Sequence, residues 1–297
     1  MTIQTWQQAL PHGITLSCRG AGERGRPVLL FLHGFPEAAF VWDELLEHFA
    51  QPAHGGYRCV APNLRGFEDS SQPADVAAYR PKHLVQDIAA LAQAEGAPLA
   101  CLVAHDWGGA LAWNLANQQP ALLQRLAIIN SPHPGTFLRA LKTSVKQQEA
   151  SAYMNFLVRP DAEQLLREDG YRRLFGFFTH WGEARWLTED VKAKYRAVWD
   201  RSLTGGLNYY RASPLRPPRE GDAAAGAIEL PREMLTVSIP TLVLWGLQDA
   251  ALLPELLDGL EDYVPRLTLE KFADASHWIV HEQPALVAQR LGAFLRQ

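Results

Sequence analysis

Asp106 lies at a tight turn between an apolar run at 99–104, typical of a buried strand, and a helical pattern at 108–118. Small residues stand two positions before it, at Ala104, and two positions after it, at Gly108. A strand that turns directly into a helix needs small side chains at these places, and the spacing is typical of a nucleophile elbow. Serine usually occupies the middle of such an elbow. A carboxylate there changes which reactions the chain can perform.

Strand and helix patterns alternate in two blocks of the chain, before residue 131 and after residue 240. A continuous apolar run such as 28–32 is expected of a strand that is covered on both faces. The alternation predicts an α/β fold with a mostly parallel sheet flanked by helices. The predicted strands are 28–32, 57–61, 99–104, 126–130, 241–245 and 267–272, and the predicted helices are 42–49, 84–96, 110–117, 254–263 and 284–297.

A helical block interrupts this alternation. No strand pattern occurs between about 136 and 211, and a loop rich in proline, glycine and alanine follows at 214–231. The helical stretches expected in the block are 138–158, 162–180, 188–200 and 207–212. We therefore predict one core, formed by residues 1–134 and 232–297, and a helical cap with its return loop at 135–231.

Composition excludes several classes of protein. The chain has 297 residues, 47% of them hydrophobic and 20% charged, which is typical of a soluble globular protein. Its net charge of −4 gives no basic excess to attract nucleic acid or anionic lipid. Residues 1–6 have neither a basic nor an apolar region, so we expect no signal peptide, and no apolar run approaches the roughly 20 residues that cross a bilayer. We expect a cytoplasmic protein that acts on a small molecule, and the oligomeric state is not indicated.

Cysteines and histidines give no sign of a disulfide or a metal site. Cys18, Cys59 and Cys101 are odd in number, widely spaced and placed in apolar stretches, so we expect buried reduced thiols. The histidines form no tight cluster of ligands, so neither a metal nor an organic cofactor is expected.

Two residues extend the elbow to a catalytic set. Asp106 alone could be a helix N-cap. However, Asp249 follows the predicted strand 241–245, and His277 follows the strand that ends at Phe272. The order nucleophile, acid, histidine after these strands is that of the α/β-hydrolase triad. Asn130 occupies the other place where such folds put the acid, and since an amide cannot act as an acid, Asp249 is favoured.

The run 33–36, His-Gly-Phe-Pro, directly follows the strand 28–32. In this fold the backbone of that segment supplies one donor of an oxyanion hole, and the N–H after the nucleophile supplies the other. We therefore predict that the N–H groups of Phe35 and Trp107 form the oxyanion hole. His33 and His105 are expected to hydrogen-bond to loops rather than to act in catalysis.

These motifs together resemble the aspartate-nucleophile branch of the α/β-hydrolase fold, and most of all the epoxide hydrolases. The resemblance rests on 33–37, 105–109, Asp249 and 276–278, and it covers nearly the whole chain. It implies that Asp106 opens an epoxide and forms an alkyl ester. Because the candidate residues of the pocket are apolar, we expect an apolar epoxide. Water activated by His277 and Asp249 would then release a vicinal diol.

Two tyrosines of the cap add to the resemblance. Tyr153 lies seven residues before Pro160, and Tyr210 follows Tyr209 in the second cap segment. Both resemble the pair of tyrosines that epoxide hydrolases offer from their caps. A phenol with a pKa near 10 can donate a proton to the epoxide oxygen at neutral pH. We assign this role to Tyr153 and Tyr210, with Tyr209 as the alternative, and name Phe35, Trp107 and Trp278 as candidates for the substrate pocket.

The sequence departs from the family pattern in the turn 63–70. Asn63 replaces the usual acid of this turn and Glu68 replaces a usual glycine. Because the turn is structural, we expect the departures to change local loop geometry rather than function.

Dehalogenases that use the same carboxylate are the main alternative. Haloalkane dehalogenases also favour tryptophan after the nucleophile, but they often carry asparagine where Phe35 stands here. Fluoroacetate dehalogenases carry arginines at the places filled by Trp107 and Ala110. Asp106 excludes a serine esterase of the usual kind. A non-catalytic ligand-binding protein on the same scaffold also remains open, although the complete triad disfavours it.

Overall fold

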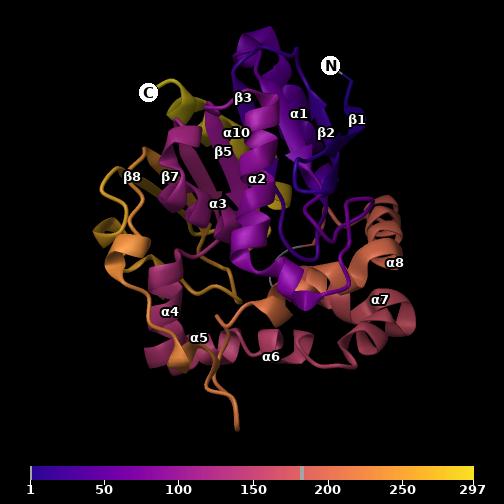
Figure 1. The fold of residues 1–297 in the computed structure, drawn as a ribbon, viewed down its shortest axis with the longest axis vertical. Coiled ribbons are helices and arrows are strands. Elements are labelled where there is room, and N and C mark those ends of the chain that lie inside the picture. The colour runs from indigo at the N-terminus through magenta and orange to yellow at the C-terminus, as the bar shows by residue number, and fades with distance from the viewer. Residues whose placement is uncertain (1, 181–183) are drawn as a thin grey trace.

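The computed structural model describes residues 2–180 and 184–297 (Figure 1). Its strands form an eight-stranded sheet in the order β1-β2-β4-β3-β5-β6-β7-β8. The pairs β1–β2 and β2–β4 are antiparallel, and every other neighbouring pair is parallel. The predicted α/β fold with a mostly parallel sheet is therefore confirmed. The strands are β1 (Gln4–Ala9), β2 (Thr15–Ala21), β3 (Val28–Leu32), β4 (Arg58–Pro62), β5 (Cys101–His105), β6 (Leu126–Ile129), β7 (Thr241–Gly246) and β8 (Leu267–Phe272).

Helices cover both faces of the sheet, because alternate residues of each central strand point to opposite sides. In β3, Leu30 and Leu32 join the core under α2 and α3, whereas Leu29 and Phe31 join the core under α1 and α10. The apolar runs of the sequence are thus explained by burial on two sides. These flanking helices are α1 (Asp43–Ala50), α2 (Pro81–Glu95), α3 (Asp106–Gln118), α9 (Ile279–Glu282) and α10 (Pro284–Leu295).

The block between β6 and β7 is helical, and its helices gather beyond one end of the sheet, at the bottom of Figure 1. The stretch predicted as helical at 138–158 is helical, but it is divided among three short helices. The stretches predicted at 188–200 and 207–212 belong to one helix that is interrupted only at Ser202, where φ is −144°. The helices are α4 (Pro134–Thr143), α5 (Val145–Ala150), α6 (Tyr153–Leu157), α7 (Ala162–His180) and α8 (Glu189–Ala212). The cap bounds of 135 and 231 stay a prediction.

Two further elements differ from the sequence-based expectation. Strands β1 and β2 do not contain the continuous apolar runs of the central strands. The side chains of β1, at the edge of the sheet, are mostly exposed, and those of β2 are fully buried mainly at alternate positions. The segment 254–263, predicted as one helix, forms two short 3₁₀ turns, Pro254–Leu257 and Leu260–Asp262. Gly259 separates the turns with φ +71°, a left-handed conformation that ends a helix.

The two departures in the turn 63–70 contact each other. The Asn63 side-chain amide donates to the Glu68 carboxylate, and Asn63 Oδ1 accepts the N–H of Ala39 at 2.8 Å. Glu68 has φ +48°, a conformation that glycine adopts without strain. The hydrogen bond between the two replacements therefore offsets part of the strain that the loss of glycine introduces.

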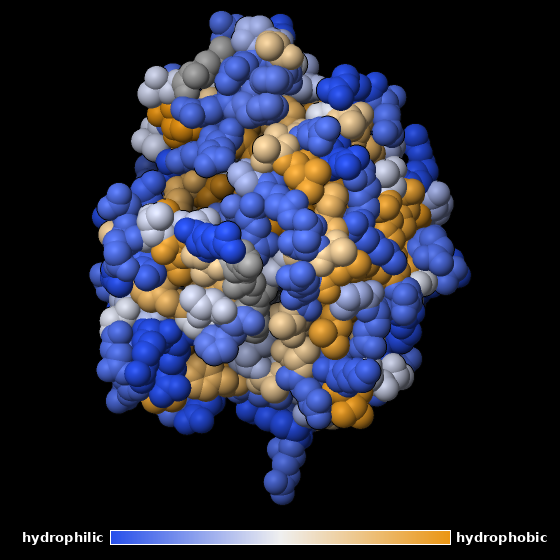
Figure 2. Space-filling view, turned by 180° about the vertical axis from the view of Figure 1, so that it is seen from behind, coloured by the Kyte–Doolittle hydropathy of each residue, from blue (hydrophilic) through white to orange (hydrophobic). Residues whose placement is uncertain are grey.

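The three cysteines are buried free thiols, as expected. Figure 2 shows one face of the molecule, on which separate hydrophobic areas alternate with a largely hydrophilic surface. In the part of the chain that the structure describes, no helix combines the length and the apolar character needed to cross a membrane.

Candidate active site

Asp106 is the first residue of α3 and follows β5 without a linker. Its φ of +49° places it in the left-handed region, which costs on the order of 1–3 kcal/mol in a residue other than glycine. The close packing of the elbow explains the small residues around it. A Cβ at Gly108 would lie 2.5 Å from the Leu32 carbonyl oxygen, and one at Gly109 would lie 2.3 Å from Ser131 Cβ. The surroundings therefore hold the Asp106 backbone in a strained conformation and fix the position of its carboxylate.

The predicted oxyanion segment lies against the Asp106 carboxylate. The N–H of Phe35 donates to Asp106 Oδ1 at 2.8 Å. A Cβ at Gly34 would lie 2.3 Å from the same oxygen, so only glycine allows this approach. Trp107 is the second residue of α3, where free backbone N–H groups and the helix dipole favour negative charge. Ser131 Oγ donates to the Asp106 carbonyl oxygen at 2.7 Å and fixes the elbow from behind.

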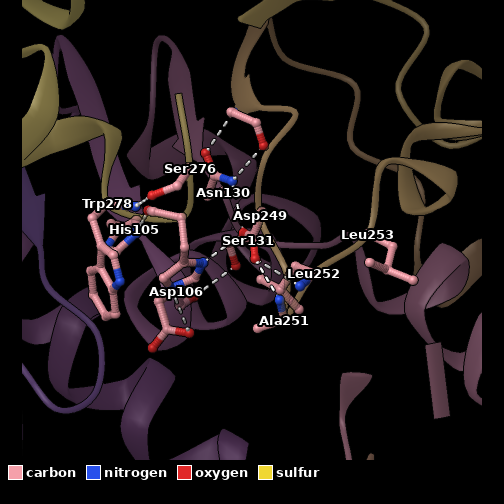
Figure 3. Close-up of polar contacts among 12 residues, drawn as sticks. His105, Asp106, Asn130, Ser131, Asp249, Ala251, Leu252, Leu253, Ser276 and Trp278 are labelled. Carbon is pink, nitrogen blue, oxygen red and sulfur yellow. Dashed lines mark hydrogen bonds and ion pairs between the residues drawn. The ribbon is translucent and has the colours of Figure 1, made fainter. Parts of the chain in front are cut away.

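The three triad candidates come together at the carboxyl ends of β5, β7 and β8. His277 Nδ1 lies 2.7 Å from Asp249 Oδ2, and His277 Nε2 lies 3.8 Å from Asp106 Oδ2. Asp249 Oδ1 accepts the N–H groups of Ala251 and Leu252 at 2.9 and 2.8 Å (Figure 3). The acid is therefore held on one side by the backbone and on the other by the histidine.

Asn130 has a positioning role that sequence analysis did not assign. Its Nδ2 donates to Asp249 Oδ2 at 2.8 Å, and its Oδ1 accepts the N–H of Gly246 at 2.9 Å (Figure 3). The residue at the alternative acid position thus holds the acid of the adjacent strand end. Its place after β6 was the available signal, because strand ends of a parallel sheet meet at one edge.

The charge of the site favours the protonated form of His277. Burial lowers the pKa of this histidine, but the carboxylates of Asp249 and Asp106 more than offset the effect and raise the pKa to about 9. Because 9 exceeds the ordinary value of 6.5, the resulting stabilisation is fully present below pH 6.5 and is lost as the pH rises through 9. At neutral pH the resting site therefore holds an imidazolium between two carboxylates.

We expect the Asp106→Asn substitution to lower the pKa of His277. The substitution removes a negative charge whose oxygen lies 3.8 Å from Nε2, so the protonated form loses one of its two stabilising partners. Titration of the imidazole resonances by NMR measures the pKa in both proteins. Asp274→Asn, which changes an exposed carboxylate, serves as the control. An unchanged His277 midpoint in Asp106→Asn would contradict the coupling.

The two predicted proton donors come from different cap helices and line the same cavity as Asp106. Tyr153 begins α6 and Tyr210 lies near the end of α8, with ring centroids 6.1 Å apart. Burial, followed by nearby carboxylates, raises the pKa of Tyr153 well above its ordinary value. Burial, followed by Tyr153 and Asp106, raises the pKa of Tyr210 as well. Both phenols are therefore protonated at any working pH.

Tyr209, the alternative to Tyr210, points elsewhere. Its hydroxyl donates to the Arg65 carbonyl oxygen at 2.9 Å and is fully buried. The Tyr209 ring forms part of the cavity wall, but its hydroxyl is bound to the core. This geometry favours Tyr210 as the partner of Tyr153.

A cavity of about 100 Å³ lies between the cap and Asp106. Trp107 lines it, as expected for a pocket candidate. Phe35 and Trp278 are not among the lining residues: Phe35 packs its ring on Tyr210 at 5.3 Å, and Trp278 lies behind His277 at 4.6 Å. The wall consists of Tyr79, Pro81, Leu84, Asp106, Trp107, Ala110, Leu111, Asn114, Ser131, Pro132, Pro134, Phe137, Tyr153, Met154, Tyr209, Tyr210, Ser213, Leu215 and Leu252.

Comparison with known proteins agrees with this geometry. Residues 27–284 match the family described as alpha/beta hydrolase fold. The chain belongs to the α/β-hydrolase fold family. Within that family it is epoxide hydrolase-like, because it is 31% identical to epoxide hydrolase 4 of Mus musculus over 96% of this chain and 77% of that protein.

Two further α/β-hydrolase relatives are similar over nearly their whole length. The AB hydrolase superfamily protein YfhM of Bacillus subtilis is 34% identical, and the match covers 96% of both chains. A solved structure described among novel epoxide hydrolases from metagenomes of hot environments is 37% identical. It covers 99% of both chains with a TM-score of 0.88.

Another buried carboxylate of this α/β-hydrolase, Glu37, is linked to the triad through His105. Its oxygens contact His105 Nδ1 at 3.1 Å and His281 Nε2 at 2.5 Å, and they accept the hydroxyl of Tyr195 at 3.0 Å. Burial raises the pKa of Glu37, but the two histidines outweigh burial and hold the pKa well below its usual range. His105 Nε2 in turn lies 2.9 Å from the His277 carbonyl oxygen. His105 therefore links the Glu37 segment to the His277 segment.

Sequence analysis did not assign a role to Glu37, because its partners come from distant parts of the chain. His33 and His105 do contact loops as expected: His33 Nε2 accepts the N–H of Leu64 at 3.1 Å. Among residues 2–180 and 184–297, no group of three or more histidine, cysteine or acidic side chains is arranged to hold a metal ion.

Proposed function

We propose that this protein hydrolyses epoxides to vicinal diols through an alkyl ester on Asp106. The observation that carries the proposal is a carboxylate nucleophile and two cap phenols, Tyr153 and Tyr210, that line one cavity. The similarity to epoxide hydrolases from a mammal and from hot environments supports the substrate class. A halide leaving group needs no pair of phenol donors, so the dehalogenase alternative leaves the tyrosines unexplained.

In the first step, an Asp106 oxygen attacks an epoxide carbon. Oδ1 accepts the N–H of Phe35, which leaves Oδ2 as the attacking oxygen. The carbon–oxygen bond of the ring breaks, and its electron pair passes to the epoxide oxygen. That oxygen takes a proton from Tyr153 or Tyr210, because an alkoxide is too basic to leave without one. A positioned acid of this kind contributes about 10²–10⁴ in rate.

In the second step, water attacks the carbonyl carbon of the ester. Once Asp106 is esterified, it carries no charge, so His277 releases its proton more readily and becomes a base. His277 then takes a proton from water, and Asp249 stabilises the imidazolium. The oxyanion forms on Oδ1 and is stabilised by the N–H groups of Phe35 and Trp107. Collapse of this intermediate breaks the ester bond, and the leaving alkoxide takes the proton of the carboxylic acid formed on Asp106, which frees the diol and restores the carboxylate. The proton that His277 released before this step passes through solvent to the tyrosinate, and His277 keeps the proton from water, so the resting imidazolium is restored.

The cavity supports an epoxide with an extended apolar substituent. Asp106, Ala110 and Asn114 line it at intervals of four residues, so they share one face of α3. At a rise of 1.5 Å per residue, this stripe extends about 12 Å from the nucleophile. Most of the remaining wall is apolar, including Leu84, Phe137 and Met154. We therefore propose an aryl or alkyl epoxide as the substrate.

A panel of substrates tests the proposed function. We expect turnover of a styrene-type epoxide to its diol, without halide release from 1-bromobutane or fluoride release from fluoroacetate. Gas chromatography measures the diol and ion chromatography measures the halides. Halide release without diol formation would assign the protein to the dehalogenases, and binding without turnover of any substrate would assign it to non-catalytic ligand-binding proteins.

The tyrosines give a second test. We expect Tyr153→Phe and Tyr210→Phe each to slow epoxide opening by about 10²-fold, because each removes one donor to the epoxide oxygen. Tyr209→Phe is the matched control: its hydroxyl contacts the Arg65 carbonyl, so its loss lowers the melting temperature more than the rate of opening. Single-turnover kinetics with the epoxide measure the opening rate. Equal rates of epoxide opening in all three variants would contradict the assignment of Tyr153 and Tyr210 as proton donors.

A further inference from the structure

We propose that Trp199 and Tyr195 of the cap helix α8 position the oxyanion donor of the core. Trp199 Nε1 donates to the Pro36 carbonyl oxygen at 2.6 Å, and the Tyr195 hydroxyl donates to Glu37 Oε1 at 3.0 Å. Pro36 and Glu37 directly follow Phe35, whose N–H donates to the nucleophile. Two side chains of the cap therefore hold the residues next to the oxyanion donor. Because neither touches the nucleophile, both are positioning residues.

The two donors form one rigid unit. They are four residues apart, so they lie on the same face of α8. Their rings stack with centroids 5.5 Å apart at 19°, and 2% of Trp199 and none of Tyr195 is exposed. Side chains with so little freedom hold a hydrogen-bond partner in a narrow range of positions.

The core holds the other side of the same segment. His33 Nε2 accepts the N–H of Leu64 at 3.1 Å, and the N–H of Ala39 donates to Asn63 Oδ1 at 2.8 Å. The residues between His33 and Ala39 form a loop that connects β3 to the next turn. Within this loop, the carbonyl oxygen of Pro36 is bound by Trp199. The core therefore binds the two ends of this loop, and the cap binds its middle.

The same helix also carries one of the proposed proton donors. Tyr210 lies eleven residues after Trp199, and the interruption of α8 at Ser202 lies between them. Ser202 Oγ accepts the N–H of Glu68 in the core at 2.9 Å, so the bend in the helix is fixed by a core contact. One cap helix thus supports the oxyanion donor and contributes a tyrosine to the cavity that Asp106 lines.

The proposal rests on the proposed two-step function and predicts different effects on the two steps. During ester formation, negative charge leaves the Asp106 carboxylate, so a weaker Phe35 hydrogen bond does not slow the attack. During ester hydrolysis, negative charge develops on Oδ1, so the same weakening raises the barrier. A displaced Phe35 N–H should therefore slow the second step alone.

The test is rapid-quench kinetics of Trp199→Phe, which keeps a ring but removes the indole donor. Acid quenching and mass spectrometry of the Asp106 peptide follow the ester with time. We expect hydrolysis of the ester to slow on the order of 10-fold, with formation unchanged or faster. Tyr195→Phe should act in the same direction, because it removes the second donor. The ester should then accumulate during steady-state turnover.

Phe175→Leu is the matched control. Its ring lies 4.8 Å from that of Trp199 by centroids, so the substitution loosens the same aromatic cluster without removing a bond to the oxyanion segment. We expect its melting temperature to fall while the ratio of the two rates stays at the wild-type value. If Trp199→Phe slows both steps equally or neither step, the positioning role is overturned. If the wild-type protein forms no ester, the proposed function itself fails.

Discussion

The His277→Gln variant should stop after the first step and retain an alkyl ester on Asp106. Glutamine keeps a polar side chain near the nucleophile, but it cannot take a proton from water. Ester formation does not need that proton transfer, because Asp106 attacks as a carboxylate. We expect steady-state turnover to fall by about 10⁴-fold, the upper end of the contribution of a general base.

Intact-protein mass spectrometry after incubation with the epoxide measures this ester. One substrate mass should be added per chain, and peptide mapping should place it on Asp106. His48→Gln is the control, because His48 lies in α1, which packs on the opposite face of the sheet from α3, the helix that carries Asp106. Full turnover in His277→Gln, or absence of the added mass, would contradict the role of His277 in the second step.

The Asp106→Asn variant should lose turnover at the first step. The amide has the shape of the carboxylate and still accepts the N–H of Phe35, but it does not attack an epoxide carbon. Loss of an attacking group that acts within a triad typically costs about 10⁴-fold or more in kcat. The fold should persist, because the substitution changes neither the size of the side chain nor the backbone contacts of the elbow.

Calorimetric titration with the unreacted epoxide and thermal unfolding separate this expectation from a structural role. Asp106→Asn should bind the epoxide with wild-type affinity, unfold cooperatively at a melting temperature near that of the wild type and give no ester. Asp274→Asn, in an exposed loop, should keep full activity. Unfolding of Asp106→Asn would indicate that the carboxylate has a structural role instead.

The parts of the site that follow strand ends could be predicted from the sequence. Apolar runs mark the strands, and parallel strands end at the same edge of the sheet, so Asp106, Asp249 and His277 could be grouped without coordinates. The closeness of Gly34 and Gly108 to their neighbours explains why the motifs contain glycine, but the distances themselves come only from the structure.

Contacts between side chains from distant segments could not be predicted. Asn130 and Asp249 are 119 residues apart, and Trp199 and Pro36 are 163 apart, and neither pair leaves a pattern in a single sequence. Adjacent residues of a helix point about 100° apart, so the choice between Tyr209 and Tyr210 depends on how α8 is rotated against the core. The packing of the cap against the core sets that rotation, and the helix propensities of the residues do not.

Labelling with heavy-oxygen water tests the central claim most directly. With enzyme in excess over the epoxide in H₂¹⁸O, a single turnover should place ¹⁸O in the Asp106 carboxylate and leave the diol unlabelled, because the new diol oxygen comes from the aspartate. After many turnovers the diol should also carry ¹⁸O. A labelled diol and an unlabelled Asp106 after the first turnover would mean that water attacks the epoxide directly, and the account of an ester on Asp106 would be wrong.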